Sequence, residues 1–163
     1  MIISPEKLQS IRVNNPNKTV AFCSGVFDLT HAGHVLFFED CKKHADILVV
    51  GVSGGLSVSN RKEPGRPVMN KYVRIKMVDS LKPVDYCFIN EPSPDGDPFF
   101  STKKALRELK PDLYVINKDA FDIPAREAMA AELGVKLLVL ERWCLPEFEK
   151  ISTTKLIEKI KGV

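Results

Sequence analysis

Short apolar runs alternate with amphipathic segments along the whole of this chain. The apolar runs are rich in Val, Ile, Leu and Phe, and each has the length of a single strand. They predict strands at 19–24, 46–53, 84–89, 111–117 and 136–140. The amphipathic segments repeat apolar residues with the helical period, and most begin near Ser, Asn, Asp or Pro, which favour helix starts. They predict helices at 5–13, 35–44, 71–81, 101–109, 126–133 and 152–160.

This alternation predicts the fold class α/β. Strand–helix–strand units place their strands in parallel, and the crossover helices cover the sheet. We therefore expect a Rossmann-like open parallel sheet of about five strands with helices on both faces. In the third of these helices, the spacing predicts a buried face made of Val73, Met77, Val78 and Leu81, with Arg74 facing elsewhere.

The stretch FCSGVFDLTHAGH, residues 22–34, joins the first strand to the following helix. Gly25 lets the backbone turn after the buried strand, and His31 and His34 fall where the helix begins. A lone histidine there is more often a cap than a catalytic group. Open α/β sheets, however, bind ligands at such junctions, and a helix N-terminus offers N–H groups to a phosphate. Asp28 and the two histidines together therefore predict a phosphate-binding site.

Length and composition narrow the class of protein. The chain has 163 residues, enough for one sizeable core, and we expect a single domain over 1–163. Its net charge of +3 is small for a nucleic-acid-binding protein but suits a polyanionic small molecule. The 4 cysteines are scattered without the spacing of a zinc site or a disulfide framework. No apolar run has the length of a membrane span, so we expect a cytoplasmic protein that binds neither membrane nor nucleic acid.

Polar groups outside the 22–34 stretch admit two interpretations each. Lys62 and Arg66, in a polar loop over 54–70, are either solvated charges or donors that close over a phosphate. Ser152 and its two threonine neighbours, at the start of the last helix, are either caps or phosphate contacts.

Three more side chains each admit a structural and a functional interpretation. Arg74 either pairs with a neighbour on its helix or contacts phosphate. Asp119, in the loop after the fourth strand, either caps a turn or binds the ribose or base of a nucleotide. Trp143, after the last strand, either covers the core or stacks on a base.

The sequence GVFDLTHAGH, residues 25–34, resembles the signature G-x-F-D-x-x-H-x-G-H of the HIGH-motif nucleotidyltransferases, in the cytidylyltransferase-like family. The sequence ISTTK, residues 151–155, resembles a second signature of that family. The resemblance implies catalytic roles for His31, His34, Lys62 and Arg66. It implies nucleotide-binding roles for Gly25, Val26, Phe27, Asp28, Gly33, Arg74, Asp119, Ser152, Thr153 and Thr154. It also implies Mg²⁺ across the phosphates, with no protein ligand to the metal directly assigned.

The implied reaction moves a nucleoside monophosphate from a nucleoside triphosphate to a phosphorylated sugar or polyol and releases pyrophosphate. The short N-terminal helix and the sequence KEPGRPV, 62–68, are similar to the adenylyltransferase domain of the bifunctional heptose enzyme, which favours ATP and heptose 1-phosphate. A glycerol-3-phosphate or other polyol-phosphate cytidylyltransferase using CTP is the alternative, and a non-catalytic nucleotide-binding regulator is the alternative of another class. Dimeric relatives and the apolar Met1, Ile2 and Ile3 predict a homodimer.

Overall fold

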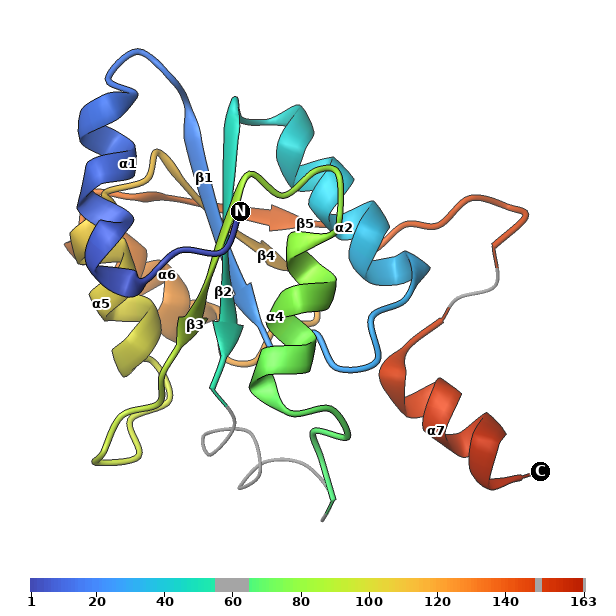
Figure 1. Cartoon of the computed structure of the whole chain (residues 1–163). Helices are drawn as coiled ribbons and strands as arrows, with labels where there is room; N and C mark the ends of the chain where they lie inside the picture. Colours follow the sequence, from blue (N-terminus) through green and yellow to red (C-terminus); the bar gives the residue numbers. More distant parts are fainter. Residues whose placement is uncertain (55–64, 149–150, 163) are drawn as a thin grey trace.

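A computed structural model describes residues 1–54, 65–148 and 151–162 of the chain (Figure 1). Helices and strands alternate as the apolar pattern predicts, and the bounds differ from the predicted ones by at most three residues. The helices are η1 (Pro5–Lys7), α1 (Leu8–Asn14), α2 (Ala32–Lys43), α4 (Lys71–Asp79), α5 (Phe100–Leu109), α6 (Ile123–Glu132) and α7 (Thr153–Lys161). The strands are β1 (Val20–Gly25), β2 (Ile47–Ser53), β3 (Tyr86–Asn90), β4 (Leu113–Asn117) and β5 (Lys136–Leu140).

The described strands form one parallel sheet in the order β3-β2-β1-β4-β5, which confirms the predicted fold class. The chain moves outward from β1 to β3 in one direction, and then returns to the other side of β1 for β4 and β5. The strand order therefore reverses between β1 and β4. Ligands of open α/β sheets bind in the crevice at such a reversal, beyond the carboxyl ends of the strands.

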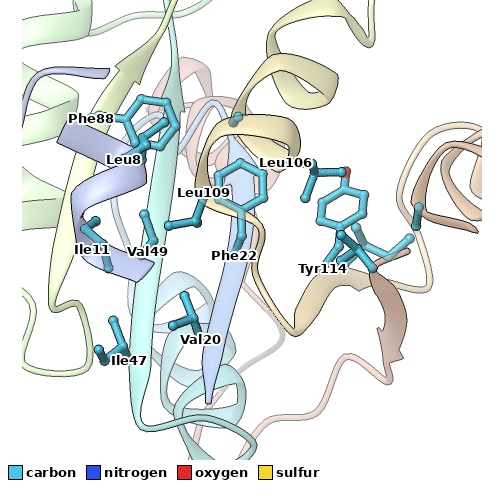
Figure 2. Packing of buried hydrophobic residues seen from close by; sticks show 14 of the residues in the cluster. Leu8, Ile11, Val20, Phe22, Ile47, Val49, Phe88, Leu106, Leu109 and Tyr114 are labelled. Carbon is cyan, nitrogen blue, oxygen red and sulfur yellow. The ribbon is translucent and has the colours of Figure 1, made fainter. Parts of the chain in front are cut away.

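Helices cover both faces of the sheet and bury two apolar clusters. On one face α1, α5 and α6 pack over Phe22, Phe88 and Tyr114, and the Phe22 ring stacks on the other two at 6.1 and 5.9 Å between centroids (Figure 2). On the other face α2 and α4 pack through Phe38 and Val78 (Figure 1). The inner strands are buried on both faces, which is why they lack a polar and apolar alternation.

The buried face of α4 differs from the prediction. Val73 and Met77 are 44% and 42% exposed, while Arg74 is fully buried beside Ile75 and Val78. The prediction was wrong because it treated Arg74 as a surface residue. The Arg74 guanidinium is buried because backbone carbonyl groups surround it and accept its hydrogen bonds.

The apolar N-terminal segment lies along the edge of the sheet. The N–H of Ile3 donates to the carbonyl of Cys87 at 2.9 Å, and the N–H of Cys87 donates to the carbonyl of Met1 at 3.0 Å. This segment thus covers part of the β3 edge, although Met1 and Ile2 keep exposed side chains. Among the described residues, no helix combines the length and the apolar character needed to cross a bilayer.

Candidate active site

The turn after β1 has an unusual backbone. Phe27 and Leu29 both have positive φ angles, of 50° and 46°, a conformation that side chains other than glycine seldom adopt. The Phe27 ring folds back over Gly25, and a Cβ at Gly25 would lie 2.9 Å from that ring. Backbone strain of this kind persists where surrounding contacts enforce it, and it clusters at functional sites. The turn leads directly into α2, which begins beside the point where the strand order of the sheet reverses.

His31 and His34 form a capping box at the start of α2. Nδ1 of His31 accepts the N–H of Gly33 at 3.1 Å, and Nδ1 of His34 accepts the N–H of His31 at 3.4 Å. The two rings stack with their centroids 4.0 Å apart. Because both Nδ1 atoms accept hydrogen bonds, the proton of each neutral imidazole is assigned to Nε2. The cap and the chemical role are therefore compatible: one ring nitrogen holds the helix and the other can donate to a ligand.

The surroundings of His31 favour its neutral form. Burial lowers the pKa of His31 below its ordinary value of 6.5, and the positive charge of Arg142 lowers it further. Gly33 leaves room for the ring, since a Cβ there would lie 3.0 Å from Cε1 of His31. A neutral imidazole at pH 7 still donates a hydrogen bond from Nε2.

Asp28 connects the turn to the segment that carries Arg66. Its side chain is buried, with 3% of the residue exposed, and it accepts the N–H groups of Val68 at 2.8 Å and Met69 at 3.0 Å. Arg74 supports the same arrangement, because its Nε donates to the carbonyl of Met69 and its Nη1 to the carbonyl of Val26. Asp28 and Arg74 therefore position backbone, and Arg74 does not extend into the crevice.

The start of α7 joins the same cluster from 125 residues away. The hydroxyl of Thr153 donates to the carbonyl of Asp28 at 2.8 Å, and Ser152 caps α7 by accepting the N–H of Lys155. Nη1 of Arg66 donates to the hydroxyl of Thr154 at 3.1 Å. In the described structure the three hydroxyls thus bond to protein groups, and the backbone N–H groups of the first turn of α7 are the more direct candidates for an anion.

The other two donors of Arg66 point to a missing anion. Its Nε and Nη2 atoms are buried, and neither has a hydrogen-bond partner among the described residues. A buried, unpaired guanidinium donor is costly, and such cases call for a bound ligand or water. Lys62, the other cation predicted for this region, lies outside the described residues, and its role stays a prediction.

Two cavities meet beside the histidines. The walls of the first cavity, of about 390 Å³, combine aromatic and aliphatic side chains with polar groups. Its lining residues are Ala32, Gly33, Leu36, Lys118, Asp119, Arg142, Trp143, Cys144, Phe148, Ile151, Ser152 and Lys155. A second cavity of about 250 Å³ lies over the ends of β1 and β4, and includes Ser24, Gly25, His34, Asn117, Arg126 and Thr153. Gly33, Asp119 and Arg142 line both cavities.

Two arginines in the cavities, Arg142 and Arg126, were not selected from the sequence, whereas Asp119 and Trp143 were. Arg142 pairs with Asp119 at 3.2 Å, so this carboxylate contacts a cation at the crevice instead of only capping a turn. Trp143 lines the larger cavity, and Nζ of Lys43 lies 4.9 Å from its ring centroid. Arg126 belongs to no sequence motif. Its position in the second cavity is evident only from the packing of α6 beside β4.

The described residues contain no cluster of three or more His, Cys, Asp or Glu side chains that could hold a metal ion. Asp28, the carboxylate of the turn, already accepts two backbone N–H groups. Magnesium commonly binds through substrate phosphates and keeps several waters. The donor set therefore fits a magnesium ion carried by a triphosphate rather than one held by protein side chains.

Known proteins are similar to this chain in sequence. Residues 22–159 match the family model described as Cytidylyltransferase-like. FAD synthase of Aciduliprofundum boonei is 34% identical over 138 residues, which make up 84% of this chain and 87% of that protein. The bifunctional protein HldE of Helicobacter acinonychis is 34% identical over 162 residues, covering 98% of this chain and 31% of HldE. This chain thus spans just under a third of the length of that relative.

Solved structures agree on the fold. The lipopolysaccharide core biosynthesis protein from Thermoplasma volcanium superposes with a TM-score of 0.64 at 25% identity, covering 79% of this chain and 99% of that one. Pantothenate synthetase from Thermus thermophilus gives a TM-score of 0.66 at 16% identity, over 99% of this chain and 70% of its own. The second likeness supports the fold alone.

Proposed function

This chain belongs to the cytidylyltransferase-like family of nucleotidyltransferases, and from that premise we propose that it transfers the nucleoside monophosphate of ATP to the phosphate of a phosphorylated sugar. The observation that carries the proposal is the histidine capping box, which assigns an Nε2 proton to both rings at the reversal point of the sheet. Heptose 1-phosphate is the favoured acceptor, because the chain resembles a heptose adenylyltransferase domain over nearly its whole length.

The reaction is a single displacement. An oxygen of the acceptor phosphate forms a bond to the α-phosphorus of the triphosphate. The bond between the α-phosphorus and its bridging oxygen to the β-phosphorus breaks, and its electron pair leaves with pyrophosphate. The acceptor phosphate is already ionised at neutral pH, so no strong general base is needed. Catalysis then depends on position and on stabilising charge at the transferring group.

Each group of site residues contacts a different part of the substrates. His31 and His34 donate from Nε2 to the transferring phosphate, where charge changes most. Arg66 and the backbone N–H groups at the start of α7 receive the leaving pyrophosphate, which supplies acceptors for Nε and Nη2 of Arg66, two donors that have none among the described residues. The larger cavity, with Trp143 and Phe148, accommodates the base. Magnesium bound with the triphosphate neutralises phosphate charge, and this chain's residues hold the phosphates in position.

Pyrophosphate release tests the proposal. Purified protein with Mg²⁺ is offered ATP or CTP, each with heptose 1-phosphate, glycerol 3-phosphate or flavin mononucleotide, the last because one relative is named FAD synthase. We expect release with ATP and a sugar phosphate, and little with either substrate omitted. Turnover only with CTP and glycerol 3-phosphate would replace the proposed substrates. Nucleotide binding without release across the whole panel would favour a non-catalytic regulator.

A further inference from the structure

Arg126 lies on the first turns of α6, and neutral groups hold its side chain. Nε donates to the carbonyl of Phe121 at 2.7 Å, and Nη1 donates to the hydroxyl of Tyr114. The guanidinium carbon lies 5.2 Å from the centroid of the Phe99 ring. These contacts come from β4, from the loop before α6 and from the residue before α5. The orientation of the guanidinium is therefore determined before any ligand arrives.

The positive charge of Arg126 has no carboxylate partner within 4.0 Å among the described residues. The aspartates in this region are engaged elsewhere. Asp122 caps α6 by accepting the N–H of Ala125, Asp119 pairs with Arg142, and Asp28 accepts two backbone N–H groups. Burial raises the pKa of the Tyr114 phenol, so that hydroxyl stays neutral and does not offset the charge. Arg126 is thus a half-buried, oriented cation without a carboxylate partner in the described part of the chain.

The position of Arg126 separates it from the base. It lines the 250 Å³ cavity together with Ser24, His34 and Thr153, and it does not line the larger cavity that contains Trp143. A nucleotide whose base occupies the larger cavity places its α-phosphate near the histidines, where the two cavities meet. The smaller cavity then remains for the group that attacks this phosphorus.

A series of interacting hydroxyl groups leads from Arg126 to the carboxyl end of β1. The Tyr114 hydroxyl also interacts with Ser24, and Oγ of Ser24 lies 3.4 Å from Oγ1 of Thr102. The cavity also contains Arg142, which pairs with Asp119, and Asp28, which accepts two backbone N–H groups. Arg126 therefore contributes a cation whose described side-chain partner is a neutral hydroxyl, beside further neutral hydrogen-bonding groups. Such a set matches a small molecule that has a phosphate and adjacent hydroxyls, because guanidinium groups bind phosphate oxygens and hydroxyls exchange hydrogen bonds.

We propose that Arg126 binds the phosphate of the acceptor and holds it beside His34 for attack on the α-phosphorus. This inference rests on the proposed nucleotidyl transfer. In this role Arg126 contacts the non-attacking oxygens of the acceptor phosphate and forms no bond to the transferring group. It is consequently a determinant of acceptor specificity, which favours phosphorylated acceptors over neutral alcohols of the same size.

A kinetic comparison tests the assignment. Wild type, Arg126→Gln and Arg126→Lys are assayed with the acceptor and triphosphate that the wild type turns over. We expect Arg126→Gln to raise the acceptor KM at least 10-fold, as loss of a charge-assisted contact does, and to leave the triphosphate KM within about twofold. Arg126→Lys should fall between the two. An unchanged acceptor KM, or an equal rise in both KM values, overturns the inference and in the second case assigns Arg126 to the nucleotide.

Arg107→Gln is the matched control, because Arg107 is an exposed arginine on α5 that pairs with Glu132 of α6 at 3.6 Å. It removes the same charge next to the same helix but outside both cavities, and its KM values should equal those of the wild type. Thermal melting of every variant shows whether a change reflects unfolding.

A binding measurement separates this inference from the proposed reaction. Inorganic phosphate is titrated by calorimetry into protein saturated with Mg²⁺ and α,β-methylene-ATP, which does not undergo transfer. We expect wild type and Arg107→Gln to bind phosphate, and Arg126→Gln to bind at least 10-fold more weakly. Equal binding by wild type and Arg126→Gln, or no binding by the wild type, overturns the anion site even if turnover is observed. Loss of binding in Arg126→Gln supports the site even if no acceptor in the panel is turned over.

Discussion

The two histidines show how single side chains can serve structure and chemistry at once. Nδ1 of each ring accepts a backbone N–H at the start of α2, which stabilises the helix terminus. Nε2 is then oriented by that same hydrogen bond, so the donor is in place before a phosphate binds. A histidine that caps a helix is therefore compatible with the catalytic role that we propose for it.

Substitutions of His31 and His34 should separate these two roles. His34→Ala and His31→Ala are each expected to lower kcat by about 10²–10³, the effect of removing one donor from developing charge. His31→Ala should also lose about 1 kcal/mol of stability, because a helix cap is removed. His31→Asn keeps an acceptor for the N–H of Gly33 but lacks the Nε2 donor, so we expect it to restore stability without turnover.

Steady-state kinetics and thermal melting of the same preparations measure both effects. His44→Ala is the control, because His44 follows α2 at its other end and should leave kcat unchanged. Wild-type kcat in a folded His34→Ala variant would show that the histidines are structural only.

The ionisation of His31 links the site to pH. Burial, together with the charge of Arg142, lowers its pKa in the folded protein, so the unfolded chain binds a proton at higher pH than the folded one. The stability that the neutral ring contributes is therefore complete above pH 6.5 and decreases as the pH falls through the folded-state pKa. Protonation also places a hydrogen on Nδ1 and breaks the bond from Gly33.

Nuclear magnetic resonance of the ring nitrogens measures this pKa directly. We expect the His31 resonances to titrate below pH 6.5, with Nε2 protonated in the neutral form, and His31→Asn identifies the signals. Arg142→Gln should raise the His31 pKa, because one positive charge is removed. Titration of His31 above 6.5 in the wild type would contradict the assignment.

Asp28 determines how separate elements of the fold are joined. Its carboxylate receives two N–H groups from residues 68 and 69, and its carbonyl receives the hydroxyl of Thr153. Three parts of the chain, the turn after β1, the segment before α4 and the start of α7, thus meet at one residue. Arg74 stabilises this junction by donating hydrogen bonds to the carbonyls of Val26 and Met69.

Asp28→Asn should loosen that junction. The amide retains one acceptor oxygen and turns an N–H₂ group toward a backbone N–H, so we expect a loss of about 2–3 kcal/mol in the free energy of unfolding. Hydrogen exchange at Val68 and Met69 should accelerate. Urea unfolding and exchange measurements provide the test. Asp40→Asn is the control, since Asp40 forms an i,i+3 pair with Lys43 on α2 and its substitution should cost less than about 1 kcal/mol. Equal effects of both variants would contradict the role of Asp28.

Helix α7 is attached mainly by its first turn. None of its residues is buried, and it stands apart from the sheet (Figure 1). Its contacts with the site include the bond from Thr153 to Asp28 and the bond from Arg66 to Thr154. A helix with so little buried surface opens at small free-energy cost, so a ligand that bridges its N-terminus and Arg66 should stabilise it.

Exchange measurements with and without Mg²⁺ and α,β-methylene-ATP test this coupling. We expect amides of α7 and of residues 65–69 to gain protection with ligand, while amides of α1, on the far face, stay unchanged. Neutralising Lys62 and Arg66 together should lower turnover more than nucleotide affinity, because their contacts strengthen toward the transition state. Identical exchange in both states, with unchanged turnover of that double variant, would make these residues a surface feature.

At the scale of the whole molecule, association between copies stays a prediction. Met1–Ile3 covers part of the β3 edge, and the exposed apolar side chains of Met1 and Ile2 are available to a second copy. We expect light scattering to give twice the chain mass of 18.3 kDa at working concentrations. The chain mass itself at every concentration would contradict a homodimer.

The sequence by itself determined the fold class and the central turn. Strand and helix periodicities are local, and the residues 22–34 hold a strand end, a glycine turn and a helix cap within one continuous stretch. Hydrogen bonds such as those of His31 and His34 span three residues or fewer, so a sequence pattern is sufficient to predict them. The cap of α7 by Ser152 is local in the same way.

Only the tertiary structure decided the surroundings of the site. Arg74 is buried because its acceptor at Val26 lies 48 positions earlier, which no helical pattern around Arg74 can indicate. Thr153 meets Asp28 across 125 positions, and Arg126 reaches its cavity because α6 packs beside the reversal between β1 and β4. Burial and charge at such positions depend on which distant backbone and side-chain groups the sheet brings together. A local sequence pattern cannot predict those partners, because they lie far away along the chain.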